Sequence, residues 1–208
     1  MSRTRAVIEY LLLFFGVVGV CIAVHVPGGP IPVLLVAAVA AFFYLRRADG
    51  FDRRTFLRPE ALRPALPSVI RLWLAVSTGA LVVVAIVDRG HLFDLPRQQP
   101  LLWLAVLIFY PLASVYPQEL IYRAFLMHRY SPAFGRTVAP AGALAFGYAH
   151  LLFGNLIAVV ATLAGGWLFA RRYRQTRSLL VVSVEHALYG ATIFTIGLGR
   201  FFYHAGHF

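Results

Sequence analysis

The chain has 208 residues, of which 60% are apolar and 13% are charged. Soluble domains carry roughly 45–50% apolar and about 25% charged residues, so this composition excludes an ordinary soluble domain. The formal net charge is +11, and every basic residue is an arginine. These arginines cluster between apolar runs and form no basic face interleaved with aromatic residues, which excludes nucleic acid as a partner. The lipid bilayer is the expected environment.

Seven apolar runs approach the length of about 20 residues that a membrane-spanning helix needs. They are approximately Ile8 to Val26, Pro30 to Leu45, Pro67 to Val87, Leu101 to Tyr116 with a polar continuation to His128, Val138 to Phe153, Asn155 to Ala170, and Leu179 to Leu198. We therefore predict an all-α polytopic membrane bundle of about seven transmembrane helices. No repeat or low-complexity tract divides the chain, so residues 1–208 are expected to form a single transmembrane domain.

The first run is too long for the apolar region of a signal peptide. The sequence Pro27-Gly28-Gly29-Pro30 predicts a turn into the second run rather than a cleavage site. Cys21, the only cysteine, lies within the first run. An intramolecular disulfide and a cysteine-based metal site are therefore excluded.

The distribution of arginine predicts the orientation, because cytoplasmic loops are enriched in basic residues. A cytoplasmic N-terminus places sixteen arginines inside and only Arg89, Arg97 and Arg200 outside. The stretch from Arg46 to Leu66 is then a cytoplasmic loop with a short surface helix. We expect a multi-pass protein of the plasma membrane with its N-terminus in the cytoplasm and its C-terminus outside.

Glu9, His25 and Arg71 lie near the ends of predicted spans, where headgroups can solvate them. Five other ionisable residues qualify as candidates inside the spans or their continuation: Glu119, Arg123, His150, Glu185 and His186. A charged side chain in hydrocarbon costs about 2.5–3.5 kcal/mol, so such residues indicate a functional site. A common polar cavity would lower the burial cost of each, because the groups could pair. Glu119 and Arg123 are four residues apart and can pair on one helix face.

Simpler interpretations exist for two of these residues. Arg123 could be one half of an ion pair at a helix end, with its charge reaching the headgroups. His150 lies among small residues and could be a hydrogen-bonded packing residue.

Together, however, the carboxylate and the histidines suit hydrolysis. A carboxylate beside a neutral imidazole can deprotonate water, and a second histidine can donate a hydrogen bond to the oxyanion that forms on a carbonyl. The same groups could instead hold a divalent metal such as zinc. Residue types alone leave this choice open.

Three motifs follow one another on successive predicted helices. Gln118-Glu119-Leu120-Ile121-Tyr122-Arg123 resembles the Glu-Glu-x-x-x-Arg motif of the CPBP family, the CAAX-type and bacteriocin-processing intramembrane proteases. Phe146 to His150 is similar to the family's Phe-x-x-x-His, and His186 to Gly190 to its His-x-x-x-Asn or Asp. The resemblance covers roughly Leu101 to Leu198. It implies N-terminal helices in residues 1–100 and a protease-like core in residues 101–208.

The resemblance also implies roles for the site residues. A glutamate and His150 would activate water, and His186 would stabilise the oxyanion. Two positions depart from the family pattern, because Gln118 replaces the first glutamate and Gly190 the asparagine or aspartate. Either Glu119 takes the role of the base or Glu185 supplies the carboxylate from the facing helix. Our first choice is Glu119 with His150 and His186, supported by Arg123 and Glu185.

We thus expect an intramembrane endopeptidase that cleaves near the terminus of a membrane-associated protein or peptide substrate. No cofactor is expected, and a glutamic mechanism is favoured over one that uses zinc or another divalent metal. One alternative is a catalytically inactive membrane scaffold or immunity-type protein of the same family, which Gln118 and Gly190 favour. A proton-coupled transporter is a further alternative, against which the lack of repeated halves argues.

Overall fold

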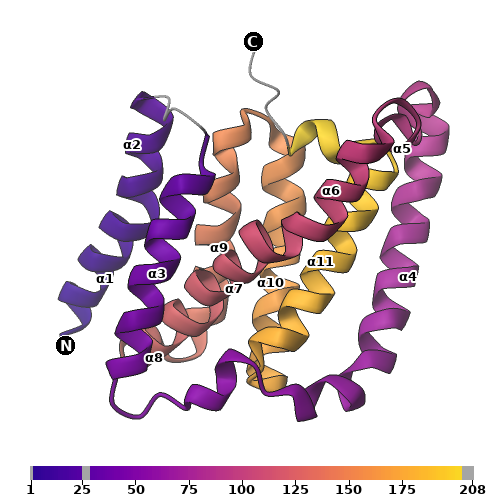
Figure 1. Ribbon diagram of the computed structural model, residues 1–208. Helices are drawn as coiled ribbons and strands as arrows, with labels where there is room; N and C mark the ends of the chain where they lie inside the picture. The colour runs from indigo at the N-terminus through magenta and orange to yellow at the C-terminus, as the bar shows by residue number, and fades with distance from the viewer. Residues whose placement is uncertain (1, 25–28, 203–208) are drawn as a thin grey trace.

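A computed structural model describes residues 2–24 and 29–202, which form helices and, over these two ranges, no strand. This confirms the prediction of an all-α polytopic bundle. The described ranges contain seven helical rods that run alternately up and down (Figure 1). The residues Val26, Pro27 and Gly28 of the predicted first span and turn lie outside the described part.

The N-terminal rods and their connections span residues 3–98. They are α1 (Arg3–Leu11), the π-helix η1 (Leu12–Gly16), α2 (Val17–Val24), α3 (Ile31–Arg47), η2 (Arg53–Phe56), η3 (Pro59–Ala61), α4 (Leu62–Val87), η4 (Arg89–His91) and α5 (Asp94–Gln98). α4 begins before the predicted Pro67, because proline is tolerated near the start of a helix. The 3-10 turns η2 and η3 lie in the predicted cytoplasmic loop.

The remaining rods carry all the motif residues. They comprise α6 (Pro100–Tyr110), η5 (Pro111–Val115), α7 (Tyr116–Glu119), η6 (Leu120–Phe125), α8 (Leu126–Phe134), η7 (Gly135–Thr137), α9 (Val138–Ala149), η8 (His150–Phe153), α10 (Leu156–Thr176), α11 (Leu179–Thr195) and η9 (Leu198–Phe201). The segments from α6 to α8 form one long rod that crosses the front of the molecule obliquely (Figure 1). It extends beyond the predicted end at His128. Two of its segments, η5 and η6, are π-helical.

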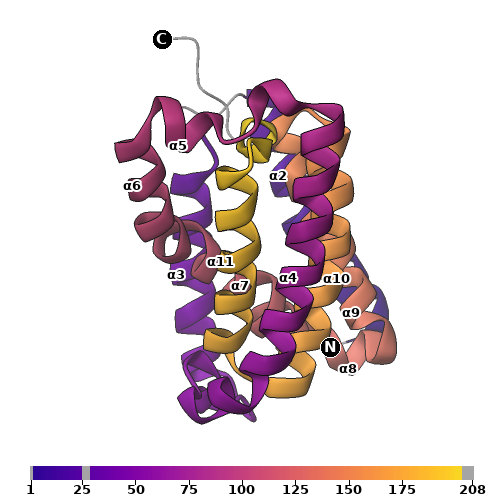
Figure 2. The ribbon, with the colours of Figure 1, turned by 90° about the vertical axis from the view of Figure 1, so that its right-hand side faces the viewer.

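Polar caps fix where α10 and α11 begin. The Asn155 side chain accepts a hydrogen bond from the backbone N–H of Ala158 at 2.8 Å, and the Ser178 hydroxyl accepts one from Val181 at 3.3 Å. Each cap satisfies a backbone donor that the first helical turn leaves free. α11 then lies between α4 and α6, as the side view shows (Figure 2).

The surface of the bundle is that of a membrane protein. Four helical stretches are long and apolar enough to cross a membrane: Arg3–Val24, Pro59–Val87, Pro100–Phe153 and Leu156–Thr176. α11 is a shorter apolar helix. Large apolar side chains such as Ile86, Val87, Leu101 and Leu156 are exposed around the outside, where lipid would cover them. The protein is therefore a multi-pass membrane protein.

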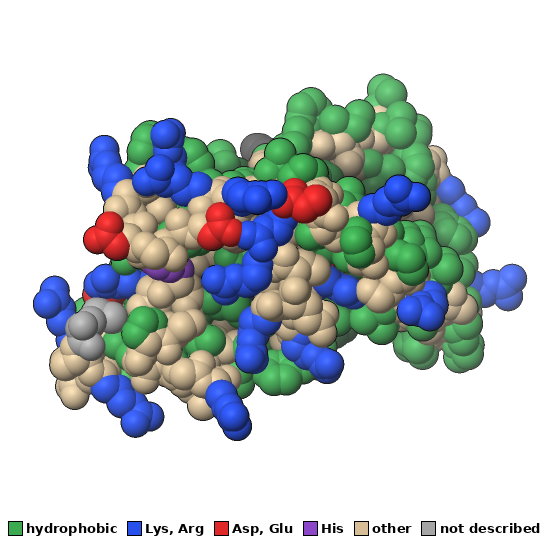
Figure 3. All heavy atoms as spheres, turned by 90° about the horizontal axis from the view of Figure 1, so that it is seen from below, with side chains coloured by type: hydrophobic (Ala, Val, Ile, Leu, Met, Phe, Trp, Pro, Cys, Tyr) green, Lys and Arg blue, Asp and Glu red, His purple; other side chains and the backbone are tan. Residues whose placement is uncertain are grey.

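Charged side chains collect at the two ends of the rods. Many arginines crowd the lower end in Figure 1, which Figure 3 shows from below. At the opposite end, Asp88 accepts hydrogen bonds from His91 and Arg200. These partners, His91 first, lower the pKa of the Asp88 carboxyl. Gly197 passes so close to the His91 carbonyl that a Cβ would lie 2.0 Å from its oxygen, and its φ of 97° also favours glycine.

Candidate active site

A hydrogen bond joins the first and third motifs inside the bundle. Oε1 of Glu119 lies 2.8 Å from Nδ1 of His186. Glu119, at the end of α7, has no exposed surface, and His186 in α11 is only 6% exposed. The oblique course of the long rod brings α7 against α11. Two costly polar groups thus share one desolvated environment, in which each satisfies the other.

Arg123 completes the charge arrangement around the carboxylate. Its Nε lies 3.0 Å from Oε2 of Glu119, although the N–H does not point at the oxygen closely enough for a hydrogen bond. The guanidinium is fully buried and lies over the rings of Phe146 and Phe169, 4.8 and 5.7 Å from their centres. Arg123 is therefore a buried counter-charge, and its environment does not fit an arginine that reaches the headgroups.

His150 also packs against Phe146. Its ring centre is 4.7 Å from that of Phe146, whereas the centre of His186 is 5.7 Å from it. Nδ1 of His150 lies 2.7 Å from the backbone carbonyl of Phe146 and must donate to it, since a carbonyl only accepts. The family resemblance makes His150 the partner of Glu119, whereas in the structure that partner is His186.

Glu185 faces away from this group and has its own partner. Its carboxylate accepts two hydrogen bonds from Arg172 of α10, at 2.7 and 3.0 Å. Arg172 also donates to the Ser68 hydroxyl of α4 at 2.7 Å. Glu185 therefore ties α11 to α10 and α4 below the candidate site, and both of its oxygens are occupied.

Sequence reasoning missed two residues that the structure places at these groups. Arg172 appears in the sequence as one of many cytoplasmic arginines, but it is buried against Glu185. An unexplained acidic residue on the next helix is the signal that could have pointed to it. Tyr110 was overlooked because it lies within an apolar run, yet its hydroxyl lies 3.2 Å from Nε2 of His186.

Gln118 is close in sequence to Glu119 but not part of the same contact. Its amide nitrogen donates to the Ser114 hydroxyl at 2.6 Å. Its amide oxygen is buried and has no hydrogen-bond partner in the described part of the chain. Glutamine cannot act as a base, so the carboxylate available on this helix is Glu119.

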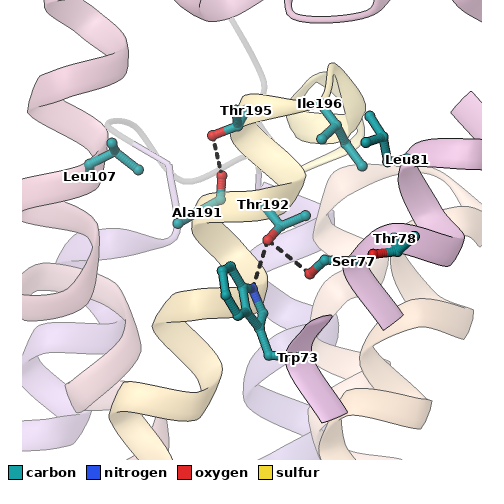
Figure 4. Close-up of a pocket in the computed structure, with 9 residues that line it drawn as sticks. All are labelled: Trp73, Ser77, Thr78, Leu81, Leu107, Ala191, Thr192, Thr195 and Ile196. Atoms are coloured by element: carbon teal, nitrogen blue, oxygen red, sulfur yellow. Dashed lines mark hydrogen bonds between the residues drawn. The ribbon is translucent and has the colours of Figure 1, made fainter. Parts of the chain in front are cut away.

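A pocket of about 310 Å³ lies between α4, α6 and α11. Figure 4 shows that hydroxyl groups and an indole line it. Trp73 Nε1 donates to the Thr192 hydroxyl at 2.9 Å, and the Ser77 hydroxyl is 3.1 Å from the same oxygen. Leu107 and Ala191 also line it. Leu107 lies about one helical turn before Tyr110, and Ala191 is the residue after Gly190. Thr192 lies seven residues, about two helical turns, after Glu185, so the pocket lies on the Glu185 face of α11 and not on the face that carries His186.

The donor set around Glu119 does not fit a metal ion. Over the described residues, no group of three His, Cys, Asp or Glu side chains is arranged to hold one. In addition, Arg123 places a positive charge beside the carboxylate, which would repel a cation. We therefore derive no step through a metal.

A comparison with protein families identifies the segment that carries this geometry. Residues 97–192 match the family model described as Rce1-like, type II CAAX prenyl endopeptidase. This part of the chain is similar to that family. The match covers just under half of the 208 residues and includes Glu119, Arg123, His150, Glu185 and His186. No curated protein and no solved structure gives a significant match.

The match to the Rce1-like family model supports an intramembrane endopeptidase of the CAAX type, which agrees with the resemblance of the three motifs. The family match ends at Thr192, so it includes most of α11 but not η9. The helices from α1 to α4 lie before the matched segment. They still contact it, since α3 packs against η6 and α4 packs against α11.

Proposed function

We propose that the protein hydrolyses a peptide bond near the membrane-associated terminus of its substrate, with water activated by His186 and Glu119. The observation that carries the proposal is the buried hydrogen bond between these two side chains. A carboxylate that accepts from one imidazole nitrogen fixes the tautomer and stabilises the imidazolium when the other nitrogen takes a proton. An intact pair of this kind also argues against the inactive scaffold.

We propose His186 as the base, on the following hydrogen bonds. Ionised Glu119 only accepts hydrogen bonds, so Nδ1 of His186 carries the proton and Nε2 carries a lone pair. Both Glu119 oxygens face positive or donating groups, namely Arg123 and His186. We therefore assign Glu119 to orient and stabilise His186, and Arg123 to hold Glu119 in place.

The reaction then follows the usual course of water attack. Nε2 of His186 accepts a proton from water as the water oxygen bonds to the carbonyl carbon, and the carbonyl oxygen becomes an oxyanion. When the C–N bond breaks, the imidazolium returns the proton to the leaving amine. His150 has its Nδ1 proton committed to Phe146. We propose that its free Nε2 accepts the second hydrogen of the same water.

The family name supplies the first substrate to test. CAAX prenyl endopeptidases, as the name states, act on prenylated proteins that end in a CAAX sequence. We propose a substrate of related form, a chain whose terminus is held at the membrane.

The test compares peptide termini of membrane proteins by mass spectrometry in cells with the wild type, Glu119→Gln or no copy. Glu119→Gln keeps the size of the side chain but not its charge, and we expect it to lower the rate about 10³–10⁴-fold. Glu9→Gln is the matched control, because Glu9 also lies on a spanning helix but pairs with Arg129 far from His186.

A terminus that requires the wild type, survives in Glu9→Gln and disappears in Glu119→Gln would support the proposal. Identical termini with and without the protein, at verified expression, would contradict it and favour the inactive scaffold. Purified protein and a farnesylated peptide ending in a CAAX sequence would give the same comparison in proteoliposomes.

A further inference from the structure

The Tyr110 ring fills the space that a side chain at position 190 would need. A Cβ at position 190 would lie 2.3 Å from Cε1 of the Tyr110 ring and 2.7 Å from its hydroxyl oxygen. These distances are far below van der Waals contact, so any side chain at position 190 requires the tyrosine to move. The absence of a side chain at Gly190 and the position of Tyr110 are therefore a single structural feature.

The ring that fills this space brings a hydroxyl to the base. Tyr110 Oη lies 3.2 Å from Nε2 of His186, on the side of the imidazole opposite Glu119. Because Nε2 carries a lone pair in the tautomer fixed by Glu119, the phenol must be the donor. The Tyr110 hydroxyl thus presents a proton at the edge of the imidazole where water and a substrate carbonyl would meet.

We infer that Tyr110 is a catalytic residue whose hydroxyl donates a hydrogen bond to the oxyanion. In the free protein this proton is directed to Nε2 of His186. A bound peptide carbonyl offers a second acceptor, and transfer of the hydrogen bond to it frees Nε2 to accept the proton from water. The inference rests on the proposed peptidase function.

This role supplies the hydrogen-bond donor that the third motif lacks at position 190. An asparagine at position 190 would stand four residues after His186, on the same face of α11, with an amide donor. Gly190 has no such donor, and in the structure the space beside it is taken by a phenol from α6. A donor from a different helix takes the place of the missing one.

The first test is Tyr110→Phe, which removes only the hydroxyl. Full-length protein in proteoliposomes is assayed on a quenched-fluorescence peptide that spans the bond identified by its terminus in cells. Loss of an oxyanion donor costs about 10²–10³-fold in kcat, so we expect a decrease of about 100-fold with little change in KM. Tyr116→Phe is the control. Tyr116 lies on the same rod as Tyr110, but its hydroxyl donates to the backbone carbonyl of Phe56 in η2 at 2.9 Å.

The second test exchanges the two positions. Gly190→Asn alone should inactivate the protein, because the new side chain displaces the Tyr110 ring. Tyr110→Ala alone should be as slow as Tyr110→Phe. The double variant Tyr110→Ala with Gly190→Asn should be at least tenfold faster than Tyr110→Ala, since the amide then has both the space and the donor.

The outcomes separate this inference from the proposed function. Full activity of Tyr110→Phe, or a change in KM alone, would overturn the inference while Glu119→Gln remained inactive and the function stood. A folded double variant that gains nothing over Tyr110→Ala would also overturn it. If the wild-type protein itself did not cleave the peptide, the proposed function would be refuted instead. Thermal unfolding of each variant shows whether a slow rate reflects the site or the fold.

Discussion

Neighbouring residues in the sequence have different surroundings at the candidate site. Glu185 and His186 are adjacent, yet Glu185 is held by Arg172 and His186 by Glu119. Successive residues on a helix point about 100° apart, so a charged pair in sequence serves two separate contacts. One contact concerns the chemistry and the other the position of α11.

Glu185→Gln is therefore expected to reduce stability and to leave the chemistry of the folded protein close to that of the wild type. The change leaves the Arg172 guanidinium buried without its counter-charge, which costs about 3 kcal/mol. Thermal unfolding in detergent, followed by tryptophan fluorescence, measures this effect. Glu60→Gln is the control, since Glu60 pairs with Arg54 on the exposed surface and exposed pairs contribute little.

A Glu185→Gln protein that keeps its unfolding temperature but loses kcat would contradict this prediction. It would instead support Glu185 as the base, in place of the glutamate that Gln118 replaces. Arg172→Met combined with Glu185→Leu should recover part of the stability, because the buried charge is then removed with its partner.

Single residues were predictable from the sequence where burial of charge is costly. Glu119, Arg123, His150, Glu185 and His186 stand out because each is ionisable within an apolar run. The pair of Glu119 and Arg123 was predictable from their spacing of four residues. The pairing of Glu119 with His186 was not, because it depends on the oblique course of the long rod. The donor at Tyr110 escaped notice because a tyrosine within an apolar run gives no comparable signal.

The contact between α9 and α10 shows how small residues place the site elements. A Cβ at Gly166 would lie 3.0 Å from Cα of Ala143 and 3.2 Å from the Phe146 ring. Close approach of two helices in a membrane depends on such residues. Phe169 follows on the same face of α10 and stacks on His186, with ring centres 4.5 Å apart.

Gly166→Val should separate the two helices, because the nearest atom is backbone and cannot move aside alone. We expect a decrease of about 1–3 kcal/mol in the free energy of unfolding, and a lower kcat as Phe169 shifts from His186. Gly79→Val is the control, since a Cβ at Gly79 in α4 meets nothing within 4 Å. Equal unfolding temperatures for the two variants would disprove the tight contact.

Most helices were predictable from apolar runs of sufficient length. The start of α4 was missed because Pro67 marks a boundary in a sequence but lies within the helix here. The fourth rod was predicted to end at His128 but continues to Phe134. Residues such as Tyr130 near its end are buried in the bundle, so the fall in hydropathy there does not mark a loop. The π-helical turns within it leave no trace in hydropathy.

At the scale of the whole molecule, the ends of the bundle differ in charge. The arginine-rich end holds the N-terminus of α1, the loop after α3 and the turn between α10 and α11, and Figure 3 shows its many basic side chains. Anionic headgroups and the positive-inside rule favour this end on the cytoplasmic side. The seven alternating rods then place the end of α11 on the opposite side.

Labelling of introduced cysteines should verify this orientation. In a Cys21→Ala background, Arg97→Cys should react with a membrane-impermeant maleimide on intact cells, because residue 97 lies at the end opposite the N-terminus. Asp49→Cys should react only after the cells are permeabilised. Both residues are exposed, so access rather than burial decides the result. The reverse pattern would invert the predicted topology.

The two wide turns on either side of Glu119 have a consequence for the evolution of the chain. A π-turn holds about one more residue than an α-turn, and such turns occur frequently at functional sites. Tyr110 and Glu119 are separated by the turn Pro111–Val115, and both reach the imidazole of His186. Deleting one residue there, with return to an α-helix, would rotate one relative to the other by about 100°. The number of residues between these two side chains therefore has to stay fixed. Insertions and deletions that hydropathy would tolerate would separate two side chains that meet at one ring, so the spacing between them is under as strong a constraint as their identity.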